Sequence, residues 1–179
     1  MRFYVRSLVL LATLVFAVGV AFAEAPKSQP ERGPPFSVGG FRYELRPNDV
    51  HMFVCEQPAC GAQSRVSYRF YAPGNTMTLG QFRDEQAQIV KVLGQRTPGQ
   101  TISILGIDGD SGIAVPRMFK ARRLMVKPDG TKEYQVSGYL FGDRGAASVI
   151  SSAATEKASA DNYAQFLIGL ALVLMPKGR

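Results

Sequence analysis

The two cysteines, Cys55 and Cys60, are separated by four residues, Glu-Gln-Pro-Ala. In an oxidising compartment so close a pair is expected to form a disulfide, which would hold a tight turn between two strands. Redox catalysis is the alternative, but its usual motif is shorter, and Pro58 stiffens this loop. A zinc site needs about four ligands, and His51 is the only further candidate nearby. We therefore expect a structural disulfide and no metal.

A second stretch has the form of a catalytic motif. Residues 109–112, Gly-Asp-Ser-Gly, resemble the nucleophile signature of the chymotrypsin-like serine proteases. That chemistry needs a histidine to accept the proton of the serine, here Ser111, and a carboxylate to orient the histidine. His51 is the only histidine of the chain, and its neighbours do not match the histidine motif of that family. We interpret the stretch as a polar hairpin turn.

The same turn places Asp108 and Asp110 at the spacing found in calcium-binding loops. Such a loop needs a further oxygen ligand at its fifth position and a bidentate glutamate at its twelfth. Gly112 and Phe119 occupy those positions, so calcium binding is not expected. The sequence therefore predicts no catalytic residues, no metal and no cofactor.

Basic residues are densest between positions 117 and 127. Strand alternation would direct Arg117 and Arg123 to one side, and Lys120 and Arg122 to the other. One of these sets could form a basic stripe, and we take the group as the candidate contact surface. The alternative is edge protection, in which charged side chains block pairing between sheets. The group consists of Arg117, Lys120, Arg122, Arg123 and Lys127.

The elements that must position these residues are indicated by alternation and by turn signals. From Thr101 to Ser152 the chain predicts four antiparallel strands joined by short turns, the clearest of which is Lys-Pro-Asp-Gly at 127–130. Pro116 cannot donate to a strand ladder, so it should lie at an edge, a bulge or a strand start. The predicted strands are 101–107, 113–126, 133–141 and 146–152. Three earlier alternating segments, 40–46, 50–55 and 65–71, predict an antiparallel meander.

Two helices complete the predicted fold. The first should begin after Thr78, where Gln81 completes a capping box, and should end at Gly94. The second should be capped by Ser159 or Asp161. Residues 166–175 of this helix are apolar nearly all round but too few to span a bilayer. We expect them to pack on the sheet, with a membrane-inserted tail as the alternative.

This order of elements defines an α+β fold: an antiparallel β-sheet of about six to seven strands packed with two helices, similar to an α/β/α sandwich. The folded domain should comprise residues 36–179 and follow a proline-rich linker at 24–35.

The N-terminus has the pattern of a signal peptide. Arg2 and Arg6 precede an apolar run at 8–20, and Ala-Phe-Ala at 21–23 fits a cleavage site. A retained membrane anchor is the alternative. Cleavage after Ala23 would remove two arginines and no acid, which lowers the formal charge from +7 to +5. We expect an exported protein of the periplasm or the extracellular space.

Several stretches of the C-terminal half are similar to the PsbP-like family of thylakoid and periplasmic accessory proteins. They are Ala121-Arg122, Tyr134-x-Val-x-Gly-x-Leu140, residues 147–152 and Asn162-x-x-x-Phe166-x-x-x-Leu170. The resemblance covers about half of the chain after residue 23. It implies a sandwich of helices and antiparallel strands with binding or assembly roles and without catalysis.

These observations favour an exported non-catalytic binding or assembly protein of the periplasm or cell envelope. A protein or an anionic envelope component is the expected partner, whereas nucleic acid is not, and no integral membrane span should remain after signal cleavage. Two alternatives stay open: a small envelope hydrolase with a site built from scattered residues, and a peripheral membrane protein that uses a basic sheet face.

Overall fold

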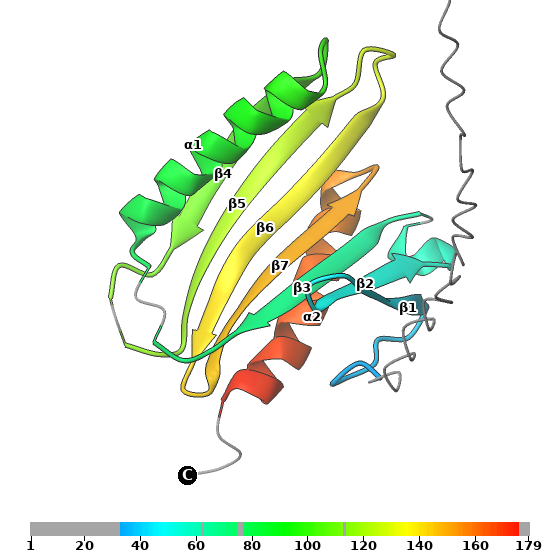
Figure 1. Ribbon diagram of the computed structural model, residues 1–179. Coiled ribbons are helices and arrows are strands. Elements are labelled where there is room, and N and C mark those ends of the chain that lie inside the picture. Colours follow the sequence, from blue (N-terminus) through cyan, green and yellow to red (C-terminus); the bar gives the residue numbers. More distant parts are fainter. Residues whose placement is uncertain (1–32, 62, 75–76, 113, 176–179) are drawn as a thin grey trace, which may run out of the picture. The chain divides into compact units, whose positions relative to one another are not determined.

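The computed structural model describes residues 33–61, 63–74, 77–112 and 114–175 (Figure 1). The predicted signal peptide, most of the predicted linker, and Ile113 lie outside these residues. The strands are β1 (Phe41–Arg46), β2 (Val50–Cys55), β3 (Arg65–Tyr71), β4 (Thr101–Gly109), β5 (Arg117–Val126), β6 (Lys132–Gly142) and β7 (Gly145–Ala153). The helices are η1 (Pro58–Cys60, a 3₁₀-helix), α1 (Leu79–Arg96) and α2 (Glu156–Leu174).

All seven strands belong to one antiparallel sheet, in the order β1-β2-β3-β7-β6-β5-β4. β1 to β3 form the predicted meander, and β4 to β7 form the predicted run of antiparallel neighbours. The two halves join where β3 pairs with β7, from Arg65 opposite Ser152 to Tyr71 opposite Ala146. The predicted α+β fold with about six to seven strands and two helices is confirmed.

The two helices pack on opposite faces of this sheet (Figure 1). On one face, which we call the α1 face, the ring of Phe82 from α1 stacks on Phe119 of β5, with ring centroids 5.6 Å apart. On the other, the α2 face, Phe166 of α2 packs edge-on against Phe53 of β2 at 4.8 Å. α1 contacts β4 and β5, at one end of the sheet, whereas α2 contacts β6, β7 and β3. Each helix therefore covers only part of its face.

Each helix is associated with its own hydrophobic cluster. Beneath α2, the buried side chains of Tyr163, Phe166 and Leu170 pack with Tyr68 of β3 and Val149 of β7. The smaller cluster beneath α1 contains Phe82, Phe119, Ala121, Phe141 and Ala146. The first cluster spans both halves of the sheet, so α2 holds the meander against the β4–β7 half.

The start of α1 is as predicted, but its end is not. The Thr78 hydroxyl accepts a hydrogen bond from the Gln81 backbone at 3.2 Å, and the Gln81 side chain accepts one from the Thr78 backbone at 2.8 Å. The helix continues through Gly94 to Arg96. A mid-helix glycine costs only about 1 kcal/mol, whereas Pro98 disfavours helical geometry at the residue before it. Proline, and not glycine, therefore determines where α1 ends.

The predicted cap of α2 was wrong as well. Thr155 is the N-cap, and its hydroxyl accepts a hydrogen bond from the Ala158 backbone at 3.2 Å. Ser159 lies within the first turns and is buried, and its hydroxyl donates to the Ser151 carbonyl of β7 at 3.0 Å. The hydroxyl thus attaches the helix to the sheet. The strand predicted at 113–126 begins only at Arg117. Pro116 therefore directly precedes β5, which is one of the three positions expected for it, a strand start.

Phe36 brings the chain onto the α2 face before β1 begins. Its ring stacks on Tyr68 with centroids 5.3 Å apart and meets Phe166 edge-on at 6.0 Å. The ring also lies against Gly169 of α2, where a Cβ atom would come within 2.5 Å of it. Because the ring is held between other aromatic side chains, it has little room to move away.

The two helical glycines should respond oppositely to alanine. Gly169→Ala should lower the free energy of unfolding, because overpacking against Phe36 costs about 1–3 kcal/mol. Gly94→Ala should raise it by about 0.5–1 kcal/mol, because a Cβ there meets no atom within 4 Å. Urea denaturation of the two variants measures both changes. Equal effects of the two substitutions would contradict this account of Phe36.

Candidate interaction surface

The structure does not bring the five basic residues of the candidate contact surface together. Arg117 and Arg123 lie on the α1 face and are only 6% and 2% exposed. Lys120 and Arg122 are half-buried on the α2 face, where Lys120 lies 3.8 Å from Asp108, and Arg122 lies 3.2 Å from Glu156. Lys127 is exposed in the turn after β5. Alternation predicted that the two pairs would lie on opposite faces of the sheet. It did not predict that α1 would cover Arg117 and Arg123.

Arg123 is the centre of a buried polar network between α1 and the sheet. Its guanidinium donates to the side-chain oxygen of Gln86 on α1 at 2.9 Å and to the Ser137 hydroxyl on β6 at 3.0 Å. It also donates to Gln135. Burial lowers the pKa of Arg123, and the nearby charge of Glu85 opposes that shift. The network fixes α1 to β5 and β6 through directed hydrogen bonds.

Arg117 has a structural role at the start of α1. Its guanidinium lies over the ring of Phe141, 4.1 Å from the centroid, and over that of Phe119 at 5.3 Å. It also donates to the carbonyl oxygen of Met77 at 2.6 Å, which ties the residues before α1 to β5. Neither buried arginine is placed to contact a partner.

Ser111 and His51 do not come together. Ser111 is exposed just after β4, at one edge of the sheet, whereas His51 is in β2, near the opposite edge. Five strand spacings separate β2 from β4, which amounts to about 24 Å. These two residues therefore cannot share a proton in one site.

The carboxylate of Asp110 accepts a hydrogen bond from the Met118 backbone at 2.7 Å. It thus closes the loop between β4 and β5. Within the described ranges, no group of three or more His, Cys, Asp or Glu side chains could hold a metal ion.

His51 instead belongs to an aromatic cluster on the α2 face. Its ring stacks on Tyr68 with centroids 4.8 Å apart, and its Nδ1 lies 3.1 Å from the Tyr43 hydroxyl. Burial lowers the pKa of His51, and the charge of Asp49 opposes this only in part. The folded protein therefore favours the neutral imidazole.

A pH dependence of stability follows from this shift. The unfolded chain should bind a proton at His51 near pH 6.5, before the folded protein does. The free energy of unfolding should therefore fall as the pH drops through about 6.5 and level off below the folded pKa. Urea denaturation at pH 7.5 and 5.5 should show this loss, and His51→Phe should remove it.

The imidazole resonance provides an independent check, because the chain has a single histidine. Its NMR titration midpoint should lie below about 6.5, the ordinary value for histidine. A midpoint above that value would contradict the burial of the neutral ring.

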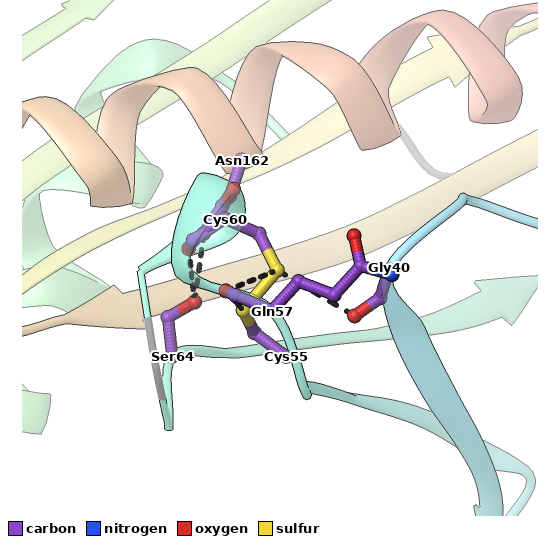
Figure 2. The surroundings of a disulfide bond; sticks show 6 residues. All are labelled: Gly40, Cys55, Gln57, Cys60, Ser64 and Asn162. Carbon is purple, nitrogen blue, oxygen red and sulfur yellow. Dashed lines mark hydrogen bonds between the residues drawn. A yellow bond between two sulfur atoms is a disulfide. The ribbon is translucent and has the colours of Figure 1, made fainter.

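The predicted disulfide between Cys55 and Cys60 is present and closes the loop between β2 and β3 (Figure 2). Asn162 points from α2 into this loop, and its side-chain nitrogen donates to the Cys60 carbonyl at 2.8 Å and to the Ser64 hydroxyl at 2.9 Å. The Ser64 hydroxyl donates to the same carbonyl at 2.6 Å. Asn162 and Ser64 are buried. The disulfide loop is thus attached to α2 as well as to the two strands.

Replacing Asn162 should test this attachment. Asn162→Ala would leave the Ser64 hydroxyl oxygen without its donor and the Cys60 carbonyl with one donor in place of two, which costs about 1–3 kcal/mol of unfolding free energy. Gln165→Ala, on the exposed side of the same helix, is the matched control and should change stability little. Urea denaturation with the disulfide intact gives both values. A loss no larger than that of the control would show that Asn162 does not hold the loop.

The described residues also contain a broad part of the α1 face that neither helix covers (Figure 1). We call it the open sheet face. Paired residues share a face, so the register places its side chains in continuous rows across β1, β2, β3 and β7. They include Arg42, Glu44, Arg46, Val50, Met52, Val54, Arg65, Ser67, Arg69, Ser148, Ile150 and Ser152.

Arginine is the dominant charge on the open sheet face. Arg42 and Arg46 both pair with Glu44, and Arg42 also lies 2.9 Å from Glu56. Arg65 lies 3.9 Å from Glu133. Arg69 is exposed, and its guanidinium lies over the ring of Tyr71, 5.4 Å from the centroid. Among the residues that the structure describes, Arg69 has no carboxylate within 4.0 Å. This guanidinium is therefore available to an external anion.

Part of this surface was predictable from the sequence. Alternation in 65–71 directs Arg65, Ser67 and Arg69 to the side opposite the core. It does not show that β7 lies beside β3 and contributes Ser148 and Ile150.

Neither helix within the described part of the chain is long and apolar enough to cross a membrane. A scan against protein-family models finds no match for this chain, and a search of curated proteins finds none either. The similarity to the PsbP-like family therefore remains an expectation from the sequence.

Proposed function

We propose that this is an exported, non-catalytic binding or assembly protein of the periplasm or cell envelope. The observation that carries the proposal is the open sheet face. It consists of fixed strands and presents four arginines, of which Arg69 has no carboxylate within 4.0 Å among the described residues. Neither α1 nor α2 covers it. Such a surface can be covered by a partner without rearrangement of the fold.

The composition of the open sheet face suits a protein partner with acidic side chains. Arginine and methionine are enriched at protein interfaces, as are aromatic residues such as the neighbouring Tyr71. Ile150, at 39% exposure, offers an apolar contact beside Ser67. Arg69 could pair with a partner carboxylate in two parallel hydrogen bonds. Strands lose little conformational entropy on binding, because they are already ordered.

Export is supported by the signal-peptide pattern at 1–23 and by the disulfide. Disulfides persist in oxidising compartments and are rare in the cytosol. The separation of Ser111 from His51 gives no support to a hydrolase built on these residues. The predicted basic group at 117–127 is not favoured as a membrane-binding face either, because Lys120 and Arg122 lie beside Asp108 and Glu156.

Site-specific photo-cross-linking in the native envelope tests the proposal. A benzoylphenylalanine residue at Ser67 or Ile150 should yield one discrete protein adduct, which mass spectrometry can identify. The same probe at Val92, which is 40% exposed on α1, is the matched control and should yield none. Arg69→Glu should reduce the adduct yield severalfold, because it places like charges opposite each other. No adduct, or equal adducts from all three positions, would exclude this surface.

A further inference from the structure

The outer side of α2 carries a second uncovered surface. Every fourth residue along it is apolar and exposed: Ala160, Ala164, Ile168 and Leu172, which we call the α2 stripe. Ile168 is 67% exposed and Leu172 71%, more than the other large hydrophobic side chains of the described residues. The helix has no charged residue after Asp161.

This exposure refines the expectation that the apolar run at 166–175 packs on the sheet. Phe166, Leu170 and Leu174 are indeed buried against the strands. The sheet can contact only one side of a helix, however, and no other described element covers the far side. Two large apolar side chains therefore face the surroundings on a helix segment that contains no charged residue of its own.

The stripe is too small for a stable contact with a second copy of the chain. An aliphatic side chain buries roughly 60–120 Å² of apolar surface. Ile168 and Leu172 together would thus bury about 200 Å², whereas a stable interface buries about 800 Å² on each partner. A lipid surface has no such minimum area, because each side chain inserts individually.

The path of the chain also points to lipid. Phe36 packs against Gly169, the residue next to Ile168, so the chain that precedes the fold leaves it beside the α2 stripe. Residues 21–35 then connect to the apolar run at 8–20. These fifteen residues span at most about 54 Å. Before signal cleavage, a membrane that holds the run therefore lies within this chain length of Phe36.

Basic residues at the C-terminal end of α2 also suit a contact between the α2 stripe and lipid. The Arg144 backbone donates to the Leu174 carbonyl at 3.1 Å, which places this exposed residue at the C-terminal end of α2. Lys177 and Arg179 follow α2 in the sequence, and Asp143 is the acidic residue beside Arg144. Basic residues near an apolar helix face favour anionic phospholipids.

We propose that the α2 stripe rests on the surface of an anionic phospholipid bilayer, with Ile168 and Leu172 in its interfacial layer. Two inserted side chains carry fewer carbons than a single acyl chain, whose own binding is marginal, so the contact is weak and reversible. The open sheet face lies on the opposite side of the same sheet. Lipid on one side and a protein on the other would therefore not compete.

Tryptophan fluorescence tests this proposal directly, because the chain has no tryptophan of its own. Leu172→Trp and Ile168→Trp each introduce one probe into the stripe, and Val92→Trp on α1 is the matched control. The full chain is reconstituted with vesicles of phosphatidylcholine and phosphatidylglycerol. The stripe probes should shift to shorter wavelength and be quenched by brominated lipid, whereas the control should be quenched at least threefold less.

Equal quenching of all three probes, or no quenching at the stripe, would overturn the proposal. A spectral shift that depends on protein concentration in the absence of vesicles would show a second copy on the stripe, and would overturn it too. All three positions are exposed, so tryptophan should not disturb the core. The cross-links expected at Ile150 do not depend on this result, so the two proposals can fail separately.

Discussion

The pairing of β3 with β7 is the constraint on which the rest of the structure depends. It joins two antiparallel units that would otherwise each end in an unpaired edge strand. Tyr71 and Ser148, whose hydroxyls lie 3.3 Å apart, are separated by 77 positions in the chain. Gly145 allows β7 to begin there, because a Cβ atom would lie 2.4 Å from the Tyr71 carbonyl oxygen. At this position the two halves of the sheet can therefore pair only through a residue without a side chain.

The two helices pack on the joined sheet through different kinds of contact. α2 lies across the junction and contacts β3 on one side of it and β7 and β6 on the other, mainly through apolar side chains. α1 lies beyond the junction, on the opposite face, and adds the hydrogen bonds of Arg123 to its apolar contacts. This offset leaves the open sheet face on one side and the outer surface of α2 on the other. Both proposed contacts therefore follow from the placement of two helices on seven strands.

Local structure could be predicted from the sequence. Which side chains of the sheet are covered by a helix could not. Alternation and turn residues located all seven strands, and the capping box at Thr78 located the start of α1, because these signals lie within a few residues of each other. Arg123 is an example. Alternation predicts which face of the sheet its side chain is on, but the side chain is buried only because α1 packs on that face. Gln86 offered a hint, because it interrupts the apolar stripe of α1 at a position that faces the sheet.

The candidate site was predictable to a similar extent. The disulfide followed from spacing and compartment, whereas its attachment to α2 through Asn162 joins residues about a hundred positions apart. No local pattern reports such a contact. The arginines of β3 were correctly directed away from the core, but the extent of the surface around them depends on the β3–β7 register. Long-range pairing determines the surface, and sequence periodicity determines only which side chains can belong to it.

The distance in sequence between β3 and β7 has a consequence for how the protein is made. Synthesis proceeds from the N-terminus, so the meander leaves the ribosome well before the strand that pairs with it. During that interval the backbone groups along one side of β3 have no partner, and exposed strand edges of this kind promote aggregation. A nascent chain of this protein should therefore depend on a chaperone, or on delayed folding, until Ala153 has emerged.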